Sequence, residues 1–82
     1  MPVPDVSAVD TELDATGLNC PMPLLKAKQA LNRMQVGEVL RVTATDPGSE
    51  RDFEVFARQS GHELLSATRN DHRFVYLLRK TA

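Results

Sequence analysis

The sequence predicts an α/β fold whose elements follow the order β-α-β-α-β-β. Two segments carry apolar residues at three- and four-residue spacing, the pattern of a helix that buries one face. Four other runs are rich in β-branched residues or alternate polar with apolar residues, which is typical of strands. The 82 residues suffice for one domain. We expect residues 11–82 to form it, and residues 1–10, with two prolines, to be a flexible tail.

The first half of the chain is predicted to form a strand, a helix and a second strand. Residues 11–15 alternate polar with apolar side chains, and Gly17 then gives the backbone freedom to turn. The first helix is expected at residues 21–35, with Gly37 as its stop signal. Residues 39–45 are rich in β-branched side chains and predict the second strand. The buried stripe of the helix is expected to comprise Leu24, Ala27, Leu31 and Met34, widened by Ala30.

The second half is predicted to form a helix followed by a hairpin. Residues 49–52 fit a capping box in which Ser49 caps the helix and Asp52 reaches back. The alternative is that Asp46 caps the helix and Pro47 opens it. Apolar spacing continues this helix to Ser60, and a glycine follows. Residues 63–69 and 73–79 are then expected to pair as strands, joined by a short loop at residues 70–72.

The single cysteine, Cys20, stands where the first helix is expected to begin. Proline is tolerated in the first turn of a helix, so Pro21 and Pro23 are predicted as first and third helical residues, with Cys20 as the N-cap. That position favours an anion and can lower a thiol pKa from about 8.5 to roughly 3.5–7.5. The alternative is a buried, inert cysteine. Because cysteine is a poor cap beside Ser, Asp or Asn, we favour a reactive thiolate.

The two strand-to-helix turns are expected to meet. If the first two strands are parallel, both turns open at the edge of the sheet where ligands bind in open α/β folds. Cys20 would then lie near Asp46, Ser49 and Arg51, and the positive charge of Arg51 would favour the ionised sulfur. The alternative is an ordinary helix start with a solvated charged face.

A stripe of exposed side chains is predicted on the first helix. Lys26 sits about 120° around the helix from Cys20, so direct contact with the sulfur cannot be assumed. It lines up instead with Met22, Gln29 and Arg33. A basic stripe is usually a solvated face, but an exposed methionine beside a reactive thiol is typical of a docking surface. We therefore expect Met22, Lys26 and Arg33 to contact a partner protein.

Composition excludes several classes of function. Ten basic and eleven acidic residues, a net charge of −1, lack the positive excess of a nucleic-acid binder. One cysteine cannot pair within the chain, and His62 and His72 have no metal-ligand spacing, so we expect no disulfide and no metal. The free thiol predicts a reducing, cytoplasmic setting. We expect no signal peptide and no membrane span.

Residues 20–26 form a complete C-P-x-P-x-x-K motif, and the sequence resembles the TusA-like (SirA) sulfur-carrier family. The resemblance extends from Thr11 to Arg79 and includes residues 15–18 and the segment from Asp46 to Asp52. It implies a two-layer sandwich with two helices on one face of a four-stranded mixed sheet. The functional positions of the family fall on Cys20, Pro21, Pro23 and Lys26.

The resemblance also implies that Cys20 carries sulfane sulfur as a persulfide. The donor would be a cysteine desulfurase or a rhodanese-like protein, and the acceptor a protein of tRNA thiolation, molybdenum-cofactor or sulfur-oxidation pathways. No cofactor or membrane contact is implied, and we expect a monomer when free. The competing hypothesis is a regulatory or RNA-binding module with an incidental cysteine, since similar folds contact RNA. A thiol–disulfide enzyme would need a second cysteine, which only a partner could supply.

Overall fold

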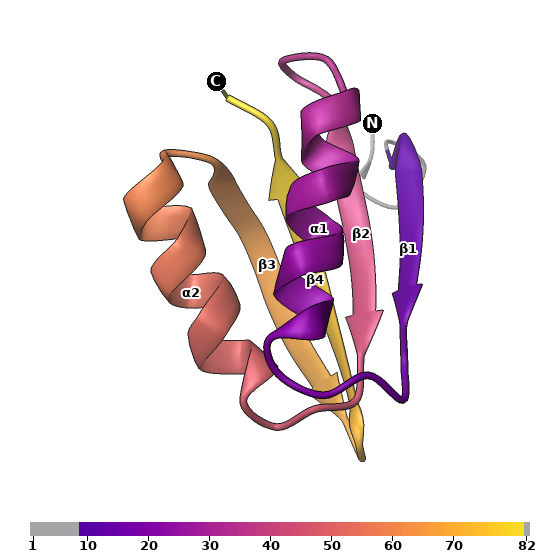
Figure 1. Ribbon diagram of the computed structural model, residues 1–82. Coiled ribbons are helices and arrows are strands. Elements are labelled where there is room, and N and C mark those ends of the chain that lie inside the picture. The colour runs from indigo at the N-terminus through magenta and orange to yellow at the C-terminus, as the bar shows by residue number, and fades with distance from the viewer. Residues whose placement is uncertain (1–8, 82) are drawn as a thin grey trace.

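The computed structural model describes residues 9–81, which form a sheet covered on one face by two helices (Figure 1). The elements are β1 (Thr11–Ala15), α1 (Met22–Arg33), β2 (Val39–Ala44), α2 (Ser49–Ser60), β3 (Glu63–Asn70) and β4 (Arg73–Arg79). The predicted element order is confirmed. Residues 1–8 of the predicted tail lie outside the described residues. Asp10, also placed in the tail, extends the sheet edge: its N–H donates to the Val39 carbonyl, and the Val39 N–H donates to its Oδ2, both at 2.9 Å.

The sheet has the strand order β1-β2-β4-β3. β1 and β2 run parallel, whereas β4 is antiparallel to both β2 and β3. The mixed sheet with both helices on one face is therefore confirmed (Figure 1). Because β1 and β2 are parallel, the turns that lead from them into α1 and α2 leave the same edge of the sheet, at the bottom of Figure 1.

Helix α1 buries most of the stripe that its apolar spacing predicts, but Leu24 and Ala30 are only partly buried. Ala27 and Leu31 are fully buried and Met34 nearly so, and Pro23 joins them. The helix ends at Arg33, two residues earlier than expected, and Met34 is the extended C-cap. Gly37 is therefore not the residue that ends the helix. The end is held instead by Lys80, whose Nζ donates to the carbonyls of Leu31 and Met34 at 2.8 Å each.

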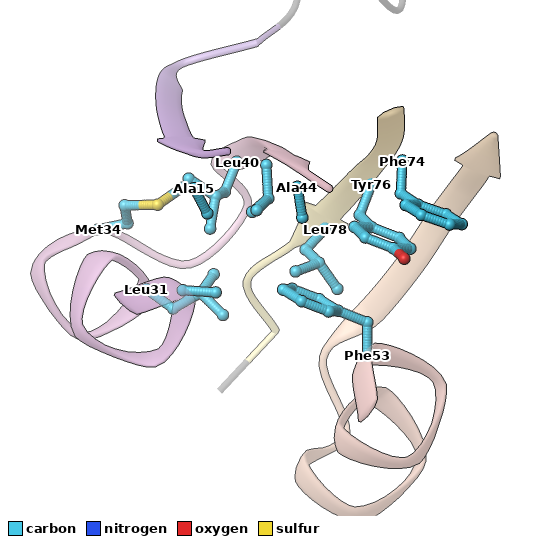
Figure 2. Close-up of a cluster of buried hydrophobic side chains, with 11 residues drawn as sticks. Ala15, Leu31, Met34, Leu40, Ala44, Phe53, Phe74, Tyr76 and Leu78 are labelled. Atoms are coloured by element: carbon cyan, nitrogen blue, oxygen red, sulfur yellow. The ribbon is translucent and has the colours of Figure 1, made fainter. Parts of the chain in front are cut away.

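Helix α2 packs on the sheet through Phe53. Its ring stacks on that of Tyr76 in β4, with centroids 4.5 Å apart and planes 5° from parallel (Figure 2). The helix ends at Gly61, which adopts the left-handed conformation with φ of 85°, as predicted. The core between the helices and the sheet comprises Ala15, Ala27, Leu31, Met34, Leu40, Val42, Ala44, Phe53, Phe74, Tyr76 and Leu78.

The hairpin of β3 and β4 completes the sheet. The predicted three-residue loop is a two-residue turn, because Asn70 still pairs with Arg73. Asp71 in that turn has a positive φ of 58°, a conformation that aspartate tolerates better than most residues. The alternation of β4 is confirmed: Phe74, Tyr76 and Leu78 are buried, and their neighbours are not. The hairpin thus contributes two aromatic side chains to the core, Phe74 and Tyr76, both from β4.

Candidate functional site

Cys20 lies on the turn between β1 and α1. Gly17 makes this turn with φ of 80°, as predicted, and its N–H donates to Thr45 Oγ1 of the neighbouring turn at 2.8 Å. The turn leaves the Cys20 side chain exposed. The Cys20–Pro21 peptide bond is cis. The expectation of an accessible thiol at this edge therefore agrees with the geometry.

The helix itself begins later than the sequence predicts. Its first residue is Met22 and its N-cap is Pro21. Cys20 therefore precedes the N-cap by one residue and lies outside the helix. The reason is a turn in which the Met22 N–H donates to the Asn19 carbonyl at 2.8 Å. That N–H is therefore already engaged within the turn. Of the two prolines, Pro21 is exposed, whereas Pro23 is buried and anchors the first helical turn to the core.

The second turn lies directly beside Cys20. A Cβ placed on Gly48 would lie 4.0 Å from Cys20 Cβ, an ordinary van der Waals distance, and 3.1 Å from Asp46 Oδ2, so the two turns lie side by side here. Asp46 Oδ2 is buried and has no hydrogen-bond partner among residues 9–81. The predicted meeting of the two turns thus holds for Asp46.

Ser49 does not play the predicted role. The N-cap of α2 is Gly48, and no side chain caps the helix, so neither the capping box nor the Asp46 cap forms. Ser49 is the first residue of the helix and only 1% exposed. Its hydroxyl forms a 2.7 Å hydrogen bond with the Tyr76 hydroxyl. Ser49 therefore points into the core and not toward the sulfur, because β4 offers it a buried polar partner.

Asp52 is the residue that reaches Cys20. The thiol donates a hydrogen bond to Asp52 Oδ2, with the sulfur and oxygen 2.8 Å apart. This contact stabilises the protonated sulfur and raises the pKa of Cys20; desolvation and the negative charges of Asp52 and Asp46 raise it further. The predicted lowering of the Cys20 pKa is therefore wrong. The sequence reasoning missed this role of Asp52 because it assigned the carboxylate to a capping box.

Arg51 does not supply the expected positive charge. Its side chain is exposed and lines a groove between α2 and β3, together with Glu54, Leu64 and Ala67. The charged groups that act on the Cys20 pKa are both carboxylates. Arg51 also lines a hollow between α1 and α2 together with Asp52, yet it is not among the groups that act on the sulfur.

The predicted docking residues share the outer face of α1. Met22, Lys26, Gln29 and Arg33, hereafter the outer stripe, are all exposed. Met22 and its neighbour Leu25 are large apolar side chains that each keep 42% of their surface exposed. The stripe begins two residues after the thiol. Within residues 9–81 no helix is long and apolar enough to cross a membrane, and no three His, Cys, Asp or Glu residues are grouped to hold a metal ion.

Comparisons with known proteins agree with the fold and with the family resemblance. Residues 11–80 match the sequence profile of the family described as sulfurtransferase TusA. The sulfur carrier protein TusA of Allochromatium vinosum is 53% identical over 72 residues, 88% of this chain and 95% of that protein. Its counterpart in Pseudomonas putida strain GB-1 is 44% identical over 73 residues, covering 89% and 91%. The crystal structure of a SirA-like protein from Desulfitobacterium hafniense shares the fold with a TM-score of 0.76, at 21% identity and covering 89% of this chain and all of that one.

Proposed function

Because the chain belongs to the TusA sulfurtransferase family and is a sulfur carrier, we propose that it carries the sulfur as a persulfide on Cys20. The observation that supports this most directly is the place of the thiol. Cys20 is the only cysteine in the sequence, and it is exposed on a turn where a second protein can reach it. Exchange between sulfurs requires this access.

The transfer needs no redox partner. The sulfur of Cys20 attacks the outer sulfur of a donor persulfide, so that a new S–S bond forms at Cys20 and the S–S bond of the donor breaks. The proton of the Cys20 thiol passes to the sulfur that the donor keeps, which leaves as a thiol. A thiolate of the acceptor protein then takes the outer sulfur in the same way and restores Cys20. Because no second cysteine is present in the chain, the persulfide is not diverted into an internal disulfide.

The partners that the family resemblance implies fit this chemistry. A cysteine desulfurase or a rhodanese-like protein would supply the persulfide, and a downstream thiol protein of a tRNA thiolation, molybdoenzyme or sulfur-metabolism pathway would accept it. A free thiol is typical of a reducing compartment, which supports a cytoplasmic setting for this exchange. We assign the docking of these partners to the outer stripe, since it begins with an exposed methionine two residues after Cys20 and continues along α1 with Lys26 and Arg33.

Mass spectrometry of the intact protein tests the persulfide. After incubation with a cysteine desulfurase and cysteine, the wild type should gain one sulfur atom, and a reductant such as dithiothreitol should remove it. The Cys20→Ser variant should gain none. If the wild type remains unmodified, or if the serine variant gains sulfur, the assignment to Cys20 is wrong.

The docking assignment is tested by charge reversal. The Lys26→Glu variant should accept sulfur from the donor several-fold more slowly than the wild type. Arg58→Glu is the matched control, because Arg58 is also basic and exposed but lies in the last turn of α2. Equal transfer rates for the two variants would contradict a specific role of the outer stripe.

A further inference from the structure

The contact between Cys20 and Asp52 joins two parts of the chain that are 32 residues apart. Asp52 is half-buried and belongs to the first turn of α2. The next residue, Phe53, is fully buried and stacks on Tyr76. The Asp52 N–H also donates to the Gly48 carbonyl at 3.2 Å. Asp52 therefore belongs to a helical turn that packs against the core, and this packing fixes its carboxylate within hydrogen-bond distance of the sulfur.

We propose that Asp52 keeps Cys20 of the unloaded carrier in the thiol form, by accepting its S–H hydrogen bond, so that the free carrier is a poor nucleophile. The proposal rests on the function proposed above, because it concerns the sulfur that would carry the persulfide. A thiol reacts slowly with disulfides, electrophiles and oxidants, since the thiolate is the reactive form. Asp52 would thus protect the empty carrier from reactions with wrong partners.

The geometry distinguishes Asp52 from the other carboxylates near the site. Asp52 Oδ2 contacts the sulfur itself at 2.8 Å. Asp46 adds a negative charge but lies against Gly48, and no hydrogen bond joins it to Cys20 among the described residues. Glu50 shares the first turn of α2 with Asp52 yet is exposed. If the direct contact controls the thiol, removal of the Asp52 charge must act on Cys20 and removal of the Glu50 charge must not.

The test is the rate at which iodoacetamide alkylates Cys20 in the unloaded full chain, measured against pH. We expect Asp52→Asn to react about threefold faster than the wild type near neutral pH, because its larger thiolate fraction is only partly offset by the weaker nucleophilicity of a less basic thiolate. Glu50→Gln is the matched control and should react like the wild type, since it removes one charge from the same helical turn. Asp52→Glu, which keeps a carboxylate, should remain nearer to the wild type than Asp52→Asn does. Equal rates for Asp52→Asn and Glu50→Gln would overturn the proposal.

A second measurement does not depend on any variant. The ultraviolet absorbance of the thiolate in the wild-type protein should appear at a higher pH than that of a cysteine in an unstructured peptide measured alongside. If it appears at the same or a lower pH, the proposal is wrong. Neither assay contains a sulfur donor, so a failure to form a persulfide would leave both results intact, and the two hypotheses can fail separately.

Discussion

The hydrogen bond between Ser49 and Tyr76 leads to a quantitative prediction about the core beneath the site. Tyr76→Phe removes one oxygen atom and leaves the ring stacked on Phe53. The Ser49 hydroxyl, only 1% exposed, would then lose its partner. Leaving a buried polar group unpaired costs about 1–3 kcal/mol. A domain of this length has a total stability of about 4–12 kcal/mol, so the loss is readily measured.

Urea unfolding of four proteins would test this prediction: the wild type, Ser49→Ala, Tyr76→Phe and the double variant. Each single variant should lose about 1–3 kcal/mol, and the double variant should lose clearly less than their sum, because it leaves no unpaired hydroxyl. If Ser49 were instead the helix cap that the sequence suggests, Ser49→Ala would cost a similar amount but would add independently to Tyr76→Phe. Additive losses would therefore refute the structural reasoning.

Two further predictions concern the C-terminal residues that close the other end of the fold. Lys80→Met should lower the free energy of unfolding by about 1–2 kcal/mol in urea titrations, because the ammonium group no longer bonds the carbonyls of Leu31 and Met34; an unchanged midpoint would contradict it. His62 Nδ1 accepts the Thr81 N–H at 3.1 Å, and desolvation and the charge of Lys80 lower the pKa of His62. The free energy of unfolding of the wild type should therefore exceed that of His62→Gln above about pH 6.5, and this difference should be lost as the pH falls through the lowered pKa of His62. A difference that does not change with pH would contradict the prediction.

The elements were predictable because their signals are local. The alternation of Phe74, Tyr76 and Leu78 identifies the buried face of β4 without reference to any other strand. Helix α2 likewise ends where Gly61 permits a left-handed residue. The end of α1 was predicted less well, because it depends on Lys80, which reaches it from the far end of the chain. No local pattern contains that contact.

The site was predictable only as far as topology determines it. Parallel β1 and β2 place the two turns at one edge, which brings Asp46 and Gly48 beside Cys20. The side chain of α2 that meets the sulfur depends on the rotation of this helix on the sheet, which the stacking of Phe53 on Tyr76 fixes. Ser49 was expected to precede the helix and is instead its first residue, bonded to Tyr76. Both contacts are long-range, so no local pattern pairs Asp52 with Cys20.

Two opposing electrostatic effects act on the protonation of the Cys20 sulfur. The helix dipole offers at most about half an elementary charge, carried by free N–H groups of the first turn. Here the Met22 N–H already bonds Asn19, and Cys20 lies outside the helix. Asp52 opposes the dipole with a full charge in direct contact with the sulfur, and Asp46 adds a second. The carboxylates therefore outweigh the dipole, which is the electrostatic basis of our proposal that the free carrier holds a thiol. On that proposal, a partner that breaks the Cys20–Asp52 contact would restore the nucleophilicity of the sulfur.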